Sequence, residues 1–259
     1  MTKFTIRVTT LLALLCATSV AMALPTQITV RVKTKDAKFL GSSMGGALIT
    51  IRNVETGELL AKGVTTGSTG NTDTIMKKPL TRGMPLSDET SARFNATIDI
   101  NEPTLVEVKA YGPLVQRQSA NTVSATQWVV PGKHIVSGDA FMLELPGLVV
   151  DVLAPPAHLQ LHSDEASQTL SIAANVTMMC GCPLKPGDLW EATKFEVKAL
   201  VKKDGGEVEE VTLSYGGHPS QFIGNYVFKG IGTYEITVYA FDPATGNTGV
   251  DRTSVVVVQ

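Results

Sequence analysis

Short runs of alternating apolar and polar residues dominate the chain, and clusters of Gly, Pro, Asn and Asp separate them. Such runs are typical of half-buried β-strands, and few segments carry the periodicity of an amphipathic helix. The pattern therefore predicts an all-β protein made of two consecutive antiparallel β-sandwich domains. The clearest strands are expected at 28–32, 48–51, 94–100, 105–108, 141–145, 148–152, 195–201, 208–213, 234–240 and 253–258.

The first 23 residues depart from this pattern. Lys3 and Arg7 precede an apolar run from Val8 to Val20, and Ala21-Met22-Ala23 follows it. This order is that of a cleaved secretory signal peptide, and the run is too short to span a membrane as a helix. The sequence thus predicts a periplasmic or extracellular protein with no membrane insertion after signal cleavage.

Two successive prolines, Pro155 and Pro156, mark the expected domain boundary, because they remove backbone donors and stiffen the connection. The first domain is expected at 24–153 and the second at 154–259. Within the first, the polar stretch 76–92 predicts a long loop, with any short helix at 87–93. The formal net charge is −2 with no basic block, which argues against binding to nucleic acid.

Part of the first domain resembles a known fold family. Residues 46–51, the turn 55–57 and a second strand ending at Thr66-Gly67 resemble a carboxypeptidase-regulatory-like or transthyretin-like sandwich. Modules of this kind are usually accessory or binding domains. The resemblance therefore implies a binding role and no catalysis.

The end of the second domain is similar to a bacterial immunoglobulin-like domain. The similarity rests on Gly232-x-Tyr234, the alternation through 240, Asp242 and the turn at Gly246-Asn247. It implies that Tyr234 is the tyrosine of a tyrosine corner, with its hydroxyl bonded to the turn before its strand.

Two motifs that resemble a catalytic or a metal-binding site have simpler explanations. Gly41 to Gly45 fits G-x-S-x-G, but the sequence leads from a loop into a strand, where a nucleophile elbow needs a strand followed by a helix. His158 and His162 would share one strand face about 13 Å apart, too far to bind one metal ion. We therefore expect no enzyme activity.

The stretch VTMMCGCP, residues 176–183, is the strongest candidate site. Counting back from Cys180 by twos gives an apolar face through Met178 to Leu170, so Cys180 continues the inward face of a core strand. In a straight strand the Cα atoms of Cys180 and Cys182 would lie about 6.6 Å apart, but Gly181 allows a tight turn. Three roles stay open: a soft-metal site, a strained or redox-active disulfide, and a buried structural pair.

The sequence thus predicts a secreted or periplasmic, non-catalytic binding protein. One candidate ligand is Cu(I) or another soft metal, because thiolate and thioether sulfurs are soft ligands. Its site would consist of Met178, Met179, Cys180 and Cys182. The alternative is a structural or protein-interaction module of the cell envelope, with buried or disulfide-bonded cysteines. Edge strands or loops of its immunoglobulin-like domain would contact an envelope or extracellular protein.

Overall fold

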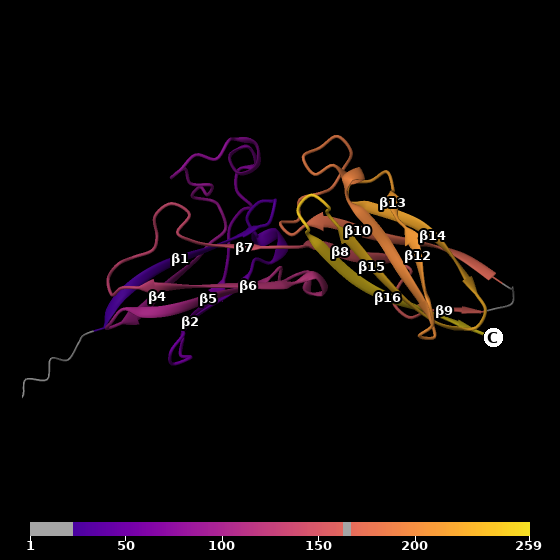
Figure 1. The fold of residues 1–259 in the computed structure, drawn as a ribbon, viewed down its shortest axis with the longest axis horizontal. Coiled ribbons are helices and arrows are strands. Elements are labelled where there is room, and N and C mark those ends of the chain that lie inside the picture. The colour runs from indigo at the N-terminus through magenta and orange to yellow at the C-terminus, as the bar shows by residue number, and fades with distance from the viewer. Residues whose placement is uncertain (1–22, 163–166) are drawn as a thin grey trace, which may run out of the picture.

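The computed structural model describes residues 23–162 and 167–259. The predicted signal peptide therefore lies, apart from Ala23, outside the described residues. Two β-sandwiches follow each other along the long axis of the molecule (Figure 1). The fold class predicted from the alternating pattern is confirmed. None of the helices in the described ranges is long and apolar enough to cross a membrane.

The first sandwich packs the sheet β4-β1-β7 against the sheet β3-β2-β5-β6. All of its strand pairs are antiparallel except β1 with β7. Ile28, Val30 and Val32 point inward from β1, and the intervening residues face the other way, as strand geometry requires. The strands are β1 (Leu24–Thr34), β2 (Leu48–Asn53), β3 (Leu59–Val64), β4 (Phe94–Ile100), β5 (Thr104–Gly112), β6 (Asn121–Val129) and β7 (Phe141–Leu145).

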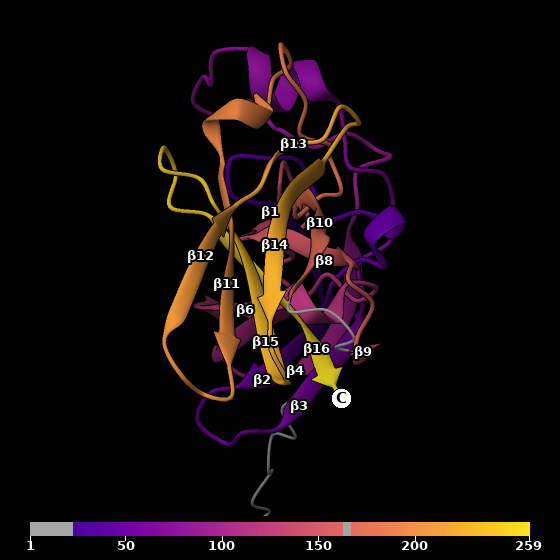
Figure 2. The ribbon, with the colours of Figure 1, turned by 90° about the vertical axis from the view of Figure 1, so that its right-hand side faces the viewer.

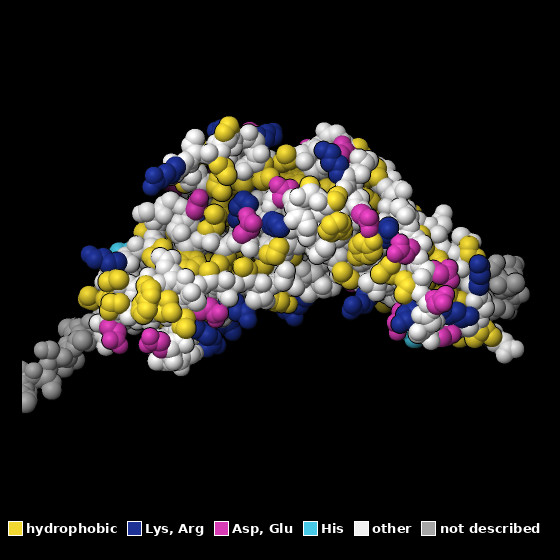
Figure 3. All heavy atoms as spheres, viewed as in Figure 1, with side chains coloured by type: hydrophobic (Ala, Val, Ile, Leu, Met, Phe, Trp, Pro, Cys, Tyr) yellow, Lys and Arg dark blue, Asp and Glu magenta, His cyan; other side chains and the backbone are white. Residues whose placement is uncertain are grey.

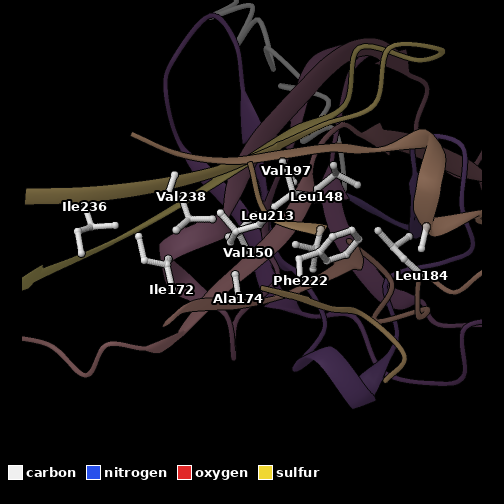
Figure 4. Close-up of a cluster of buried hydrophobic side chains, with 14 of the residues drawn as sticks. Leu148, Val150, Ile172, Ala174, Leu184, Val197, Leu213, Phe222, Ile236 and Val238 are labelled. Carbon is white, nitrogen blue, oxygen red and sulfur yellow. The ribbon is translucent and has the colours of Figure 1, made fainter. Parts of the chain in front are cut away.

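The second sandwich packs the sheet β13-β14-β10-β8 against the sheet β12-β11-β15-β16-β9. Figure 2 shows these strands nearest the viewer, and Figure 4 shows side chains of both sheets meeting in the core between them. The strands are β8 (Leu148–Ala154), β9 (Leu159–His162), β10 (Ser167–Met178), β11 (Glu196–Lys203), β12 (Val208–Thr212), β13 (Ser214–Tyr215), β14 (Gln221–Lys229), β15 (Gly232–Phe241) and β16 (Thr248–Val258).

Strand pairing divides the chain earlier than the proline pair suggested. β7 pairs with β1 in the first sandwich, whereas β8 pairs with β10 in the second. Residues 148–153, which the sequence analysis assigned to the first domain, therefore contribute to the core of the second. The change of sheet falls at Pro146-Gly147.

Two local expectations were wrong. His158 has a positive φ of 57° and lies in the turn before β9, so it does not share a strand face with His162. Residues 87–93 form no helix; the helical turns are η1 (Ser42–Met44), η2 (Asp73–Lys77), η3 (Arg117–Ser119) and η4 (Ala192–Lys194). In the loop, the Asp88 carboxylate instead accepts hydrogen bonds from the backbone of Thr90 and Ser91, an arrangement that favours a turn.

The tyrosine corner forms as the resemblance implied. The Tyr234 hydroxyl donates to the carbonyl oxygens of Lys229 and Gly230, in the turn between β14 and β15. Its ring is buried and packs edge-to-face against Phe228. The hydroxyl thus satisfies two turn carbonyls while the ring contributes to the core.

Candidate functional site

The sulfur-rich segment forms a tight turn at the end of β10, and we call Met178–Cys182 the sulfur turn. The backbone N–H of Gly181 donates to the Met178 carbonyl at 2.8 Å, and the N–H of Met178 donates to the Cys182 carbonyl at 3.0 Å. Gly181 has a φ of 79°, which favours glycine. This turn brings the two cysteine Cα atoms to 5.4 Å, and the sulfurs form a disulfide bond.

All four residues of the predicted metal site are buried. Met178 and Met179 are 0% and 1% exposed, and Cys180 and Cys182 are 2% and 7% exposed. Ile172, Ala174 and Val176 precede them on the same buried face, as the count by twos predicted. The two cysteines are therefore joined by a disulfide and buried. In this state the cysteines present no thiolate to a metal.

The sulfur turn lies where the two sandwiches meet. Met44 of the first sandwich covers Gly181. A Cβ atom added at Gly181 would collide with the thioether sulfur of Met44. Met179 packs against Gly147, directly after the change of sheet. Neither contact could be read from the local sequence, because each depends on the way the sandwiches dock.

Polar contacts fix the docking of the two sandwiches at this junction. The buried Asn247 side chain accepts from the Gly147 N–H at 2.9 Å and donates to the Lys35 carbonyl at 3.0 Å. The Trp190 indole donates to the Asp36 carbonyl at 3.0 Å. Ala37 is fully buried within the core cluster of the second sandwich. The turn of the first sandwich at residues 35–37 thus accepts hydrogen bonds from the second sandwich and contributes a side chain to its core.

Three oxygen-bearing side chains of the second sandwich, Asp242, Asn247 and Asp251, are engaged in hydrogen bonds within the protein. Asp242 accepts from the Thr245 hydroxyl and the Ala244 N–H, and Asp251 accepts from the Val152 N–H. Asn247 holds the junction. No group of three or more metal-binding His, Cys, Asp or Glu side chains occurs within the described parts of the chain.

The outer edge of β8 is closed by side chains of the neighbouring segments. The Ser119 hydroxyl accepts from the Val150 N–H at 3.0 Å, and the Val150 carbonyl also accepts from the Gln118 amide at 3.1 Å. The Asp251 carboxylate accepts from the Val152 N–H at 2.8 Å. These bonds satisfy backbone groups that a free sheet edge would otherwise present.

The edge strand β6 is open by contrast. It pairs with β5 on one side, and no backbone hydrogen bond joins it to any other described strand. Five successive residues, 124–128, are exposed, and Trp128 is 57% exposed. The nine residues of β6 include no charged residue and no proline. They therefore lack the features that usually prevent a further strand from pairing.

The other sheet edges in the described ranges are short or charged. β9 has four residues and β13 has two. Figure 3 shows acidic side chains over the part of the second sandwich where β11 and β12 lie. The charged residues of the remaining edge strands are Lys62 in β3, Asp99 in β4, Glu144 in β7, and Glu209 and Glu210 in β12.

Comparison with known proteins adds no functional assignment. No protein-family model matches the chain, and no curated protein matches it. Among solved structures, the chain is similar to fibronectin(III)-like modules of CbhA from Clostridium thermocellum at 16% identity. The match covers 90% of this chain and 91% of that chain with a TM-score of 0.28.

Proposed function

We propose that the chain is an exported, non-catalytic protein-interaction module that binds an extended segment of another polypeptide along β6. The open, uncharged edge of β6 is the observation that supports this function. Strand addition needs unpaired backbone donors and acceptors in a row, and pockets or faces for alternate side chains. Residues 124–128 meet the first need because no described strand bonds to their outer edge. They meet the second need because both faces of the strand are exposed there.

The predicted occupant is a strand without charges. Ser124 and Thr126 face one side of the sheet, and Ala125 and Gln127 face the other. A charged side chain directly beside these residues would find no described counter-charge on β6. A second copy of the same strand meets this requirement, and so does any uncharged β-branched segment. The proposed site is on the first sandwich, whereas the contact predicted from the sequence was on the immunoglobulin-like second domain.

The test uses a peptide with the sequence of residues 121–130 as the probe strand. Added to the full protein, it is expected to slow hydrogen exchange of the amides of 124–128 and to change Trp128 fluorescence. Light scattering of the protein alone reports whether a second copy fills the edge instead. Unchanged exchange at saturating peptide, in a protein that stays monomeric, would show that β6 does not add a strand.

Charged variants separate edge pairing from general association. Thr126→Lys combined with Gln127→Lys places a cation on each face of β6, and should abolish peptide binding and any β6-mediated dimer. Val208→Lys combined with Thr212→Lys adds the same charge on the exposed edge of β12 and serves as the matched control. Equal loss in both double variants would contradict the proposal, because charge alone would then explain it.

Soft-metal binding by the sulfur turn stays a prediction, and it applies to the reduced protein. Reduction of the disulfide by a dithiol gives the Cys180 and Cys182 thiols, and the thioether of Met44 lies beside Gly181. Soft sulfur ligands favour Cu(I). Cu(I) titration of reduced wild type against Cys180→Ser/Cys182→Ser tests it, and identical binding in both would contradict it.

A further inference from the structure

The outer face of the sheet β3-β2-β5-β6 brings together three cations from three strands. Thr50 of β2 pairs with Lys62 of β3 on one side and with Lys109 of β5 on the other. Neighbouring strands lie about 4.8 Å apart, so the Cα atoms of Lys62 and Lys109 lie about 10 Å apart in one row. Arg52 follows two residues along β2, on the same face. Strand register thus builds a basic patch from a sequence that has no basic block.

The positive charge of this patch is not compensated within the sheet. The four strands contain one carboxylate, Glu107, which lies opposite Arg52. In the parts of the chain that the structure describes, no ion pair joins the three cations of the patch to a carboxylate. Figure 3 shows Lys and Arg side chains along the side of the first sandwich where β2 and β5 lie. A surface of this sign favours an anionic partner.

The hydroxyl groups of the same face are available as well. Tyr111 and Thr122 form the neighbouring row across β5 and β6, and Ser124 and Thr126 follow along β6. Their side-chain hydroxyls, and that of Thr50, make no hydrogen bond to another described residue. Each hydroxyl can donate one hydrogen bond and accept others. The face therefore offers a ligand both charged and neutral hydrogen-bonding groups.

The outer face of the second sandwich uses the same kinds of side chain differently. The Lys198 ammonium donates to the Glu210 carboxylate at 3.0 Å, which joins β11 to β12. The Tyr239 hydroxyl donates to the Glu196 carboxylate, which joins β15 to β11. Lysine, tyrosine and glutamate side chains thus pair with each other on the second sandwich. On the first sandwich they stay apart and remain accessible to a ligand.

Two aromatic rings flank the patch along the strands. Tyr111 lines an open hollow of about 320 Å³ together with Arg52, Lys109 and Thr122. Trp128 lies on the same face at the other end of β6 and is 57% exposed. Six residues separate Thr122 from Trp128, which is about 20 Å along the strand. The face therefore suits an extended ligand, longer than one small molecule, with apolar surface that can pack on an aromatic ring.

The chemistry of the face narrows the class of extended anion. Lys and Arg side chains bind carboxylates through charge-assisted hydrogen bonds. The free hydroxyls match a ligand that has many hydroxyls of its own, and the Trp128 ring matches the C–H face of a sugar ring. An acidic peptide supplies the carboxylates but not the hydroxyls. A lipid surface would bring Glu107 and the hydroxyls of β6 against apolar chains, which is unfavourable.

We propose that the outer face of β3-β2-β5-β6 binds an acidic polysaccharide, whose uronate carboxylates are held by Lys62, Arg52 and Lys109. A sugar ring packs on Trp128, and the hydroxyls of β6 bond to those of the sugar chain. This site uses the face of the sheet, whereas strand addition uses the backbone edge of β6. The two are therefore separate binding functions of the first sandwich.

Titration of the full protein with an oligogalacturonate tests the proposal. The probe is expected to shift the amide resonances of β2 and β5 in NMR spectra and to change Trp128 fluorescence. An uncharged oligosaccharide of equal length should bind at least about tenfold more weakly, and added salt should weaken binding of the acidic probe. Unmoved resonances on β2 and β5, or equal binding of the uncharged oligosaccharide, would overturn the proposal.

Two other polyanions separate sugar recognition from charge alone. Polyglutamate with the same number of carboxylates presents the charge without sugar rings, and phosphatidylglycerol vesicles present an anionic lipid surface. Both are expected to bind more weakly than the oligogalacturonate. Equal or tighter binding of polyglutamate would contradict sugar recognition. Tighter binding of the vesicles would assign the face to a membrane surface and overturn the choice of a polysaccharide.

Charge variants assign the binding to this face. Lys62→Gln combined with Lys109→Gln removes two exposed cations of the patch and should weaken oligogalacturonate binding by about fivefold to tenfold. Lys133→Gln combined with Lys229→Gln removes two exposed lysines outside the patch and is the matched control. Equal weakening in the two double variants would overturn the assignment, because net charge alone would then explain the binding.

Two further variants test stacking and the separation of the two sites. Trp128→Ala should weaken oligogalacturonate binding and Trp128→Phe should retain most of it, whereas unchanged binding in Trp128→Ala would contradict stacking. Thr126→Lys combined with Gln127→Lys, designed to block strand addition, keeps all three cations of the patch. It should therefore bind the oligogalacturonate at least as tightly as the wild type. Loss of sugar binding in this variant would show that face and edge are not separate sites.

Discussion

Strands β8 and β6 are both sheet edges near the junction, and they treat their outward backbone groups differently. η3, which lies just before β6, supplies the Ser119 and Gln118 side chains that bond to Val150 on β8. β6 itself receives no such bond along residues 124–128. Of these two edges, β8 is closed by side chains and β6 is left open along the described residues 124–128. An edge that is closed supports docking within the molecule, and an edge left open is available to another chain.

The largest effect is expected where β8 packs against β16. A Cβ at Gly249 would collide with the Leu148 carbonyl, which is backbone and cannot rotate away. Gly249→Ala should therefore lower the free energy of unfolding by about 3 kcal/mol, measured by urea denaturation. Gly206→Ala, in a surface turn, is the control and should cost less than a third as much. Similar losses of unfolding free energy in the two variants would mean that β8 can move away from the added Cβ at no extra cost in stability.

Removing the hydroxyl that closes β8 should have the next largest effect. Ser119→Ala leaves the Val150 N–H buried without a partner, which costs about 1–3 kcal/mol. Hydrogen exchange of the Val150 amide should accelerate in the same variant. An unchanged unfolding free energy would show that the edge of β8 does not depend on this side chain.

The same loss of a hydroxyl on β6 should be close to neutral. Thr126 is exposed and makes no side-chain hydrogen bond to a described residue, so Thr126→Ala should change stability by no more than about 0.5 kcal/mol. Comparing it with Ser119→Ala under the same denaturation conditions measures the difference between the two edges directly. Equal losses of stability in Thr126→Ala and Ser119→Ala would contradict the proposed difference between the closed edge of β8 and the open edge of β6.

The smallest effect concerns Asp151, a carboxylate within β8. Burial and the neighbouring Asp251 raise the pKa of Asp151 above its ordinary value. Its protonated form therefore favours folding, and this contribution is lost as the pH rises through the raised pKa. Asp151→Asn should melt at a higher temperature than the wild type at pH 7, and the difference should vanish near pH 3.

A control for this pH dependence has the opposite sign. The Lys185 side chain lowers the pKa of Asp188, so that ionised Asp188 stabilises the fold at neutral pH. Asp188→Asn should therefore melt slightly lower than the wild type at pH 7. Parallel curves for the two variants would show that neither carboxylate responds to its neighbours.

Alternation revealed the strands that have one buried face, and it failed for the strand that matters most. β1 and β15 alternate because each faces a core, whereas residues 124–128 of β6 are exposed on both faces and show no such pattern. β6 was not among the expected strands, although its β-branched and aromatic residues, such as Thr126 and Trp128, favour a strand. β8 was expected as a strand, but only the pairing with β10 shows which sandwich it completes.

The candidate sites were visible in the sequence to different degrees. The inward face through Met178 and Cys180 followed from alternation, and Gly181 indicated that the chain could turn there. Whether the sulfurs join depends on the turn geometry, which residue types alone do not determine. Lys62, Arg52 and Lys109 look like ordinary outward residues of separate strands. Their position in one patch depends on strand register, and no local pattern encodes that register.

The buried Ala37 gives the molecule a mechanical property. Strand β1 and the C-terminus lie toward opposite ends of the long axis (Figure 1), so tension between the start of β1 and the C-terminus passes through the junction. There the chain connection at Pro146-Gly147 acts in parallel with the contacts made by Asn247 and Ala37. A few contacts of this kind resist less than a full strand ladder. Under load the sandwiches should part at this seam first, and re-dock when the load is released.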